Sequence, residues 1–160
     1  RLWKVPDVER RRAIARLEEA LNPPVPADGF ARSRPLTWEQ VAEMAGGGME
    51  FGSHTVSHPI LTQLDDQQLR HELAESKITL DRHLRRPTIA VAYPVGQSFA
   101  YNARVQQVAQ ESGYRIGVTY VKGTNLRQNL QRYGLKRLHV EREVGRSEFA
   151  AMLSLPEIFA

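Results

Sequence analysis

Apolar residues recur at helical spacing in two segments of the chain. In residues 7–21, Ile14, Leu17 and Leu21 fall on one face, while arginines and glutamates occupy most of the other positions. A second and longer pattern predicts a helix over 66–85. Its buried stripe comprises Leu69, Leu73, Leu80 and Leu84. The sequence therefore predicts two amphipathic helices.

Capping residues mark where helices begin and end. Thr37 and Gln40 fit a capping box for a short helix, which the glycines at 46–48 must end. Asp65 and Gln68 fit a second capping box in front of the long helix.

Two further helices are predicted in the second half of the chain. The first spans 102–112, with Asn102 as its N-cap and Gly113 just past its end. The second is short, with Ser147 as its cap and Leu153 as its last residue.

Short apolar runs between these helices predict strands. The clearest is 88–92, a continuous run typical of a buried parallel strand, and others lie at 49–53, 115–120 and 137–140. Strands that alternate with helices form a parallel sheet with right-handed crossovers, so the predicted fold class is α/β. Functional sites of such folds lie at the carboxyl ends of the strands. The pattern alone does not distinguish a barrel from an open sheet, because it fits both.

Composition limits the class of protein. A chain of 160 residues with 41% hydrophobic and 25% charged residues supports one globular domain, here 36–160, preceded by a helix and a proline-rich linker in 1–35. There is no run long enough to span a membrane and no signal peptide. The absence of cysteine excludes disulfides and thiolate ligands. The chain begins at Arg1 rather than at methionine, which favours a processed or shortened chain and leaves the compartment open.

The net charge of +4 adds one alternative. Residues 122–137 contain five basic and no acidic side chains, which would suit a polyanion. No aromatic interleaving or base-reading motif accompanies them, so a solvated face is favoured and we expect no nucleic-acid partner.

Two histidines follow the first predicted strand. If the chain turned helical at His54, it and His58 would share a face with their Cβ atoms roughly 6 Å apart. Two neutral imidazoles at that separation can chelate one divalent metal ion. Ser53, Thr55 and Ser57 surround the pair with hydroxyls that can support the ligands by hydrogen bonds. The alternative is a chance spacing in a chain with five histidines.

This stretch also resembles a known motif. Residues 52–61, Gly-Ser-His-Thr-Val-Ser-His-Pro-Ile-Leu, closely resemble the metal-binding motif of the polysaccharide deacetylase (NodB-homology) family, carbohydrate esterase family 4. Leu-Thr-Trp-Glu-Gln-Val at 36–41 and Tyr-Pro-Val-Gly at 93–96 are similar to other parts of that family. The resemblance covers residues 36–155 and implies a distorted (β/α) barrel of the polysaccharide deacetylase type, incomplete at the N-terminus.

The resemblance implies roles for individual residues. His54 and His58 would bind a divalent metal ion, commonly zinc in this family, together with an aspartate, while a second aspartate acts as base. Val95 maps most directly to the position whose backbone N–H contacts the oxyanion. Tyr93 would shape the acetyl pocket at the substrate, with Pro94 beside it. The alternative for this Tyr-Pro pair is a rigid turn at the end of a strand.

The chain departs from the family pattern in three ways. The Asp-Asp-Gly segment expected before residue 36 is missing, since Asp28-Gly29 has no preceding aspartate, and with it go the third ligand and the base. Ala92 stands where many members carry an arginine that orients the base. His139 is the only candidate for the leaving-group acid, although its flanks better match a closing strand.

Two functions follow as hypotheses. The first is a metal-dependent deacetylase, present here as an incomplete C-terminal fragment, that acts on an acetylated polysaccharide or peptidoglycan-like glycan. The second is a non-catalytic carbohydrate-binding or assembly module on the same fold. Two histidines alone predict weak metal affinity. A barrel without its first strand exposes a sheet edge, which favours a homodimer.

Overall fold

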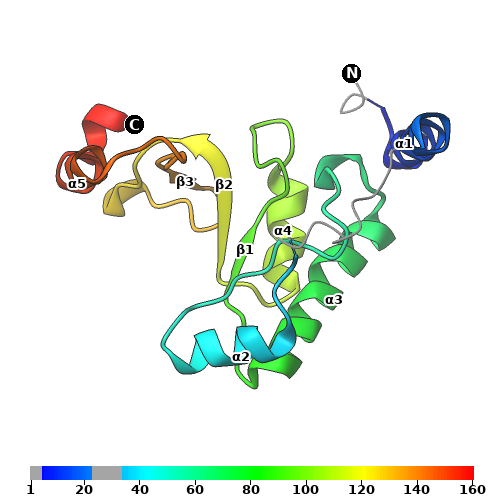
Figure 1. Cartoon of the computed structure of the whole chain (residues 1–160), viewed down its shortest axis with the longest axis horizontal. Helices are drawn as coiled ribbons and strands as arrows, with labels where there is room; N and C mark the ends of the chain where they lie inside the picture. Colours follow the sequence, from blue (N-terminus) through cyan, green and yellow to red (C-terminus); the bar gives the residue numbers. More distant parts are fainter. Residues whose placement is uncertain (1–4, 23–33) are drawn as a thin grey trace.

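The computed structural model describes residues 5–22 and 34–160 (Figure 1). Its sheet has three parallel strands in the order β1 (Ala90–Ala92), β2 (Ile116–Lys122) and β3 (Leu135–Arg137). The predicted α/β class with a parallel sheet is therefore confirmed. The described strands form an open sheet, and closure into a barrel stays a prediction.

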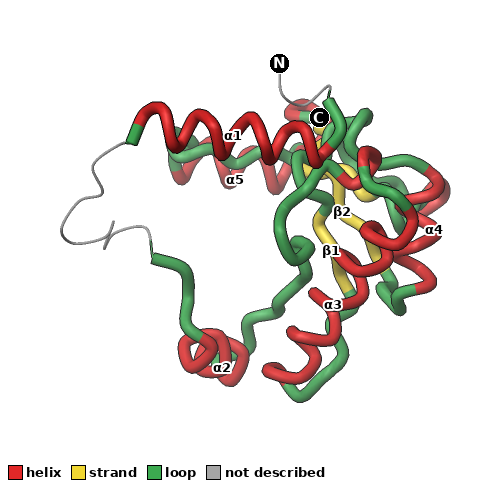
Figure 2. The backbone as a smooth tube through the Cα atoms, turned by 90° about the vertical axis from the view of Figure 1, so that its right-hand side faces the viewer, coloured by secondary structure: helices red, strands yellow, loops and turns green. Residues whose placement is uncertain are grey.

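Helices connect and cover these strands. The helix α4 crosses from β1 to β2, as parallel neighbours require, and packs beside α3 (Figure 1). The helices α1 and α2 lie apart from the sheet, and α2 packs against α3 (Figure 2). The described helices are α1 (Asp7–Leu21), α2 (Trp38–Gly46), α3 (Asp66–Leu84), α4 (Ala103–Glu111) and α5 (Arg146–Ser154), with short 3₁₀ turns at Leu61–Gln63, Arg127–Asn129 and Pro156–Phe159.

Three predicted N-caps are confirmed. The Thr37 side chain accepts from the Gln40 N–H at 3.3 Å, and the Gln40 side chain accepts from the Thr37 N–H at 2.9 Å. Asp65 and Gln68 make the same reciprocal pair at 2.8 and 3.2 Å. Asn102 accepts from the N–H three residues later at 3.0 Å. These bonds satisfy backbone donors that a helix start leaves open.

Three other local predictions are wrong. Residues 49–53 form no strand, because only Ser53 finds a partner, in a single parallel bridge to Val91. The last strand lies at Leu135–Arg137 rather than 137–140, because its pairing with β2 begins at Leu135. The last helix already begins at Arg146 after Gly145, so Ser147 lies inside the first turn and caps nothing.

The core lies between α3, α4 and β1. Its buried members include Leu69 and Leu73 of the predicted stripe, whereas Leu80 and Leu84 are only half-buried. The apolar face of α1 is not covered, and Leu17 is 51% exposed. The other core residues are Leu61, Leu64, Val91, Tyr93, Val105, Val108, Ala109 and Tyr114. None of the helices in the described ranges is long and apolar enough to cross a membrane.

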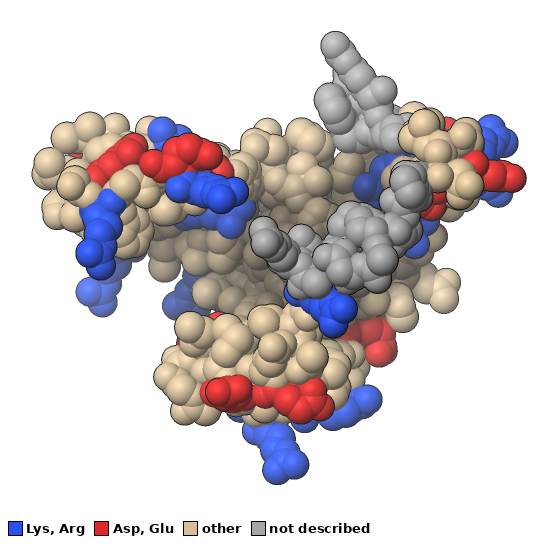
Figure 3. All heavy atoms as spheres, viewed as in Figure 1, with Lys and Arg blue, Asp and Glu red and all other residues tan. Residues whose placement is uncertain are grey.

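Some predictions fall outside the described residues. These are the proline-rich linker at 23–26 and the Asp28-Gly29 pair. The boundary at 35/36 stays a prediction. The face in Figure 3 shows lysines and arginines spread over separate parts of the molecule and interleaved with acidic side chains, which is typical of a solvated surface.

Candidate metal centre

The structure brings the two motif histidines together. The ring centroids of His54 and His58 lie 4.7 Å apart, with the rings nearly perpendicular at 79°, and both side chains are exposed. Nδ1 of His54 lies 2.7 Å from the carbonyl oxygen of Ala92. A carbonyl oxygen can only accept, so Nδ1 donates to it, which in the neutral ring leaves the lone pair on Nε2. A neutral imidazole held in this tautomer is suited to bind a metal ion through Nε2.

The histidine loop, residues 53–58, is not helical. Thr55 and His58 have positive φ angles of 70° and 56°, in the left-handed region that costs free energy for residues other than glycine. Side-chain hydroxyls hold this backbone: the Thr55 N–H donates to Ser53 Oγ at 3.2 Å, and the His58 N–H donates to Thr55 Oγ1 at 3.1 Å. These hydroxyls thus bind the loop backbone, and their predicted hydrogen bonds to the ligand rings stay a prediction, while the helical geometry considered for the loop is absent.

Ser53 connects the loop to the core. Its hydroxyl lies 2.8 Å from that of Ser76, which lies 3.1 Å from the hydroxyl of Tyr114. Tyr114 in turn donates to the carbonyl of Leu73 at 2.9 Å. All three hydroxyl-bearing residues are buried, so this series of hydrogen bonds satisfies polar groups that water cannot reach.

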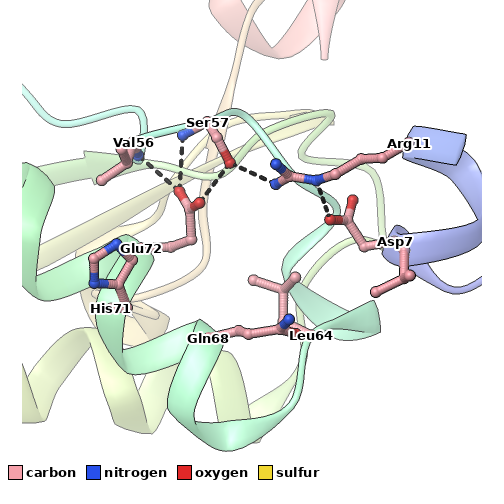
Figure 4. Close-up of a pocket in the computed structure, with 9 residues that line it drawn as sticks. Asp7, Arg11, Val56, Ser57, Leu64, Gln68, His71 and Glu72 are labelled. Atoms are coloured by element: carbon pink, nitrogen blue, oxygen red, sulfur yellow. Dashed lines mark hydrogen bonds and ion pairs between the residues drawn. The ribbon is translucent and has the colours of Figure 1, made fainter. Parts of the chain in front are cut away.

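Glu72 is a site residue that the sequence did not reveal. It lies in a run of charged residues on α3, yet it is only 6% exposed. Its carboxylate accepts from the N–H groups of Val56 and Ser57 at 2.8 and 2.9 Å, and from the Ser57 hydroxyl at 2.5 Å (Figure 4). Burial alone would raise the pKa of Glu72, but these hydrogen bonds outweigh it and the pKa lies below its usual value. A signal was present in the sequence, since Glu72 is three residues from Leu69 and shares its buried face.

The helix α1 reaches the same loop through Arg11. Arg11 donates to Ser57 Oγ at 2.8 Å and to the buried carboxylate of Asp7 at 2.6 Å (Figure 4). A cavity of about 420 Å³ lies between α1 and α3, and its lining includes these residues and Glu72. Arg11 thus connects α1 to the histidine loop.

The second predicted part of the site is the loop at 93–96, the oxyanion loop. Tyr93 is only 3% exposed and its hydroxyl donates to the carbonyl of Tyr133 at 3.0 Å, beside Gly117, which leaves room for it. Burial raises the pKa of the Tyr93 hydroxyl. Pro94 is also buried. Both predicted substrate-binding side chains therefore pack beneath the loop in this structure instead of facing solvent.

Val95 has an uncommon backbone conformation. Its φ is 62°, which is a clear outlier for a β-branched residue, and its side chain is 39% exposed. The following N–H, of Gly96, donates to the Pro94 carbonyl at 2.6 Å, and the Gly96 carbonyl accepts from the Tyr120 N–H at 2.7 Å. Among the described residues the Val95 N–H has no hydrogen-bond acceptor, and its role as a donor to substrate stays a prediction.

His139 lies close to the oxyanion loop through Tyr120. Its ring stacks on that of Tyr120 with 4.0 Å between centroids, and its Nε2 lies 3.1 Å from the Tyr120 carbonyl. The N–H of the same Tyr120 donates a hydrogen bond to the carbonyl of Gly96. No contact recorded within 5–22 and 34–160 joins His139 to His54 or His58.

The donor set fits a metal ion in part. Two imidazoles lie close together, but the described part of the chain contains no group of three His, Asp, Glu or Cys residues able to hold a metal. The third ligand that the family pattern expects is thus not supplied by these residues.

Comparison with known proteins places this arrangement in a family. A family model described as polysaccharide deacetylase matches residues 13–117 of the 160. The chain belongs to the polysaccharide deacetylase family. The match contains the histidine loop and the oxyanion loop, and it ends before His139.

Relatives of the family support this assignment. "Putative polysaccharide deacetylase YxkH" of Bacillus subtilis (strain 168) is 36% identical over 118 residues, which cover 74% of this chain and 41% of that protein. The Streptococcus pyogenes deacetylase PplD, solved in complex with acetate, is 34% identical with a TM-score of 0.67, over 74% of this chain and 50% of PplD. BC0361, a polysaccharide deacetylase from Bacillus cereus, shares the fold at 23% identity and a TM-score of 0.61, over 74% of this chain and 37% of BC0361. The chain thus spans half or less of each relative.

Proposed function

We propose that this chain carries the histidine ligands of a metal-dependent deacetylase that releases acetyl groups from an acetylated polysaccharide or peptidoglycan-like glycan. The observation that carries the proposal is the pair of imidazoles at 4.7 Å, with Nδ1 of His54 bound to a backbone carbonyl. Family membership supports the reaction class, and the acetate bound to PplD supports an acetyl-derived product.

The metal would be held by His54 and His58, with zinc as the expected ion because two imidazoles suit it. A divalent ion at such a site polarises the acetyl carbonyl and lowers the pKa of a bound water. This chain's contribution is to hold both rings by backbone and hydroxyl bonds, which limits the reorganisation required when the ligands bind. An aspartate from outside the described residues would complete the set.

Val95 and His139 would act on the substrate side. The Val95 N–H, without an acceptor in the described ranges, would donate to the oxygen on which negative charge develops. His139 would protonate the departing amine or alcohol of the sugar, and Tyr120 links it to the oxyanion loop. Tyr93 and Pro94 would support that loop from below.

Zinc titration by calorimetry tests the proposal. We expect one site on the wild-type chain, at least about tenfold weaker in His54→Ala and in His58→Ala because each removes a ligand. His71→Ala is the matched control, since His71 is an exposed histidine on α3, and it should bind as wild type. Binding that is unchanged in both ligand variants would contradict the metal site.

A longer chain that includes the family's Asp-Asp-Gly segment extends the test to the reaction. Zinc should bind it more tightly than the 160-residue chain, and acetate should be released from N-acetylated or O-acetylated oligosaccharides. Release should fall by about 10²-fold or more in His139→Gln, which cannot protonate the leaving group.

The second candidate function is a non-catalytic carbohydrate-binding module. It is favoured by the lack of a third metal-binding side chain among the described residues. Oligosaccharide binding that persists without zinc and without His54, together with no acetate release from the longer chain, would support it.

A further inference from the structure

Glu72 lies directly behind the segment that joins the two histidines. We propose that Glu72 is a positioning residue, which holds His54 and His58 in the geometry that binds the metal. This inference rests on the proposed metal site. Its carboxylate does not touch either ring. It acts on the backbone of Val56 and Ser57, the residues between the ligands.

In the described part of the chain, the side-chain hydrogen bonds of Glu72 all go to this loop. One oxygen accepts both backbone N–H groups, and the other accepts the Ser57 hydroxyl. Charge-assisted bonds of this kind are about twice as strong as neutral ones. Glu72 is 6% exposed, so water competes poorly for the same donors. Three bonds from one buried group thus fix two successive residues of the loop.

The loop needs this support because its backbone is strained. Thr55 precedes the clamped pair and His58 follows it, and both have positive φ. Each such residue costs on the order of 1–3 kcal/mol and persists only where its surroundings hold it. Without Glu72, the N–H groups would lose buried partners and the loop could relax to ordinary φ angles. His58 would then turn away from His54.

Ser57 extends the clamp to α1. Its hydroxyl donates to Glu72 and accepts from Arg11, so its proton is directed toward the carboxylate (Figure 4). The lowered pKa of Glu72 agrees with a carboxylate that is bonded in its charged form.

The test compares Glu72→Gln with Glu75→Gln on the 160-residue chain. Gln at 72 keeps the size but replaces one acceptor oxygen by an NH₂ group, which faces N–H donors. Glu75 is exposed on the same helix and is the matched control. We expect zinc affinity to fall about tenfold or more in Glu72→Gln and to stay at the wild-type value in Glu75→Gln. Amide exchange of Val56 and Ser57 in the zinc-free chain should become faster only in Glu72→Gln.

Two further measurements separate positioning from general destabilisation. Urea unfolding shows whether Glu72→Gln is folded under the titration conditions, and the ring ¹⁵N shifts of His54 report its tautomer. If Glu72→Gln does not fold, Ser57→Ala removes one bond of the clamp from an exposed position and should weaken zinc binding by a smaller factor.

The outcomes distinguish this inference from the proposed function. His54-dependent zinc binding in wild type, with unchanged affinity in the folded Glu72 variant or in Ser57→Ala, overturns the positioning role and leaves the metal site intact. If the wild-type chain shows no zinc binding that depends on His54, the proposed metal site is overturned, and the positioning role with it.

Discussion

The histidine loop and the oxyanion loop lie at the ends of neighbouring segments, but they are held in different ways. In the first, side chains hold the backbone: the Glu72 carboxylate and two hydroxyls, those of Ser53 and Thr55, accept four successive N–H groups. In the second, backbone binds backbone, through Gly96 and Tyr120, over a buried Tyr93. The first loop should therefore be sensitive to side-chain chemistry and pH, and the second to the space around its backbone.

The largest expected effect breaks the oxyanion loop. In Gly96→Ala, the new Cβ would lie 2.6 Å from the Tyr120 nitrogen at a φ of +62°. Strain and overlap together should lower the free energy of unfolding by roughly 2–4 kcal/mol. Urea denaturation measures the change.

Gly46→Ala is the control for that substitution. Gly46 ends α2 and has no atom near its would-be Cβ, so alanine there should be neutral or stabilise by up to about 1 kcal/mol. Equal destabilisation by both changes would show that the close packing at Gly96 is not the cause.

An intermediate effect is expected from the buried hydrogen bonds that connect the histidine loop to the core. Tyr114→Phe removes the hydroxyl that donates to Leu73 and contacts Ser76, and leaves buried partners unsatisfied. The expected loss is about 1–2 kcal/mol in urea denaturation. Amide exchange should increase more at Thr55 than at Tyr120. Tyr101→Phe serves as control, because the Tyr101 hydroxyl has no recorded partner in the described part of the chain, and it should change neither measurement.

The smallest effect separates the two loops by pH. The pKa of Glu72 is lowered in the folded chain, so its contribution is complete above its ordinary value of 4.5 and is lost as pH falls through the lower folded pKa. Amide protection factors at Val56 and Ser57 should decrease over that acidic range, whereas that of Tyr120, bonded to a backbone carbonyl, should not. A parallel decrease at all three amides would indicate global unfolding instead. Glu72→Gln should abolish the pH dependence.

The sequence predicted those parts of the molecule whose causes are local. The capping boxes at Thr37 and Asp65 depend on residues three apart, and both appear as expected. The pairing of His54 with His58 followed from one short motif. The hydroxyls around the pair lie as expected in the loop, where two of them bind its backbone.

Predictions failed where the cause lies far along the chain. Glu72 is 15 residues from Ser57, and its charged neighbours gave it the pattern of a surface residue. Burial of Tyr93 depends on Gly117 and Tyr133, which only the fold brings near. The expected strand at 49–53 had the right composition, but a strand also needs a partner, and only Ser53 has one.

The bond from His54 to Ala92 also bears on how the site can evolve. The acceptor is a main-chain carbonyl, which every amino acid supplies. Its position relative to His54 is fixed by the parallel bridge between Ser53 and Val91. Substitution at position 92 can therefore change the side chain without removing the group that selects the tautomer of His54. The orientation of the first histidine is thus independent of which side chain stands at position 92.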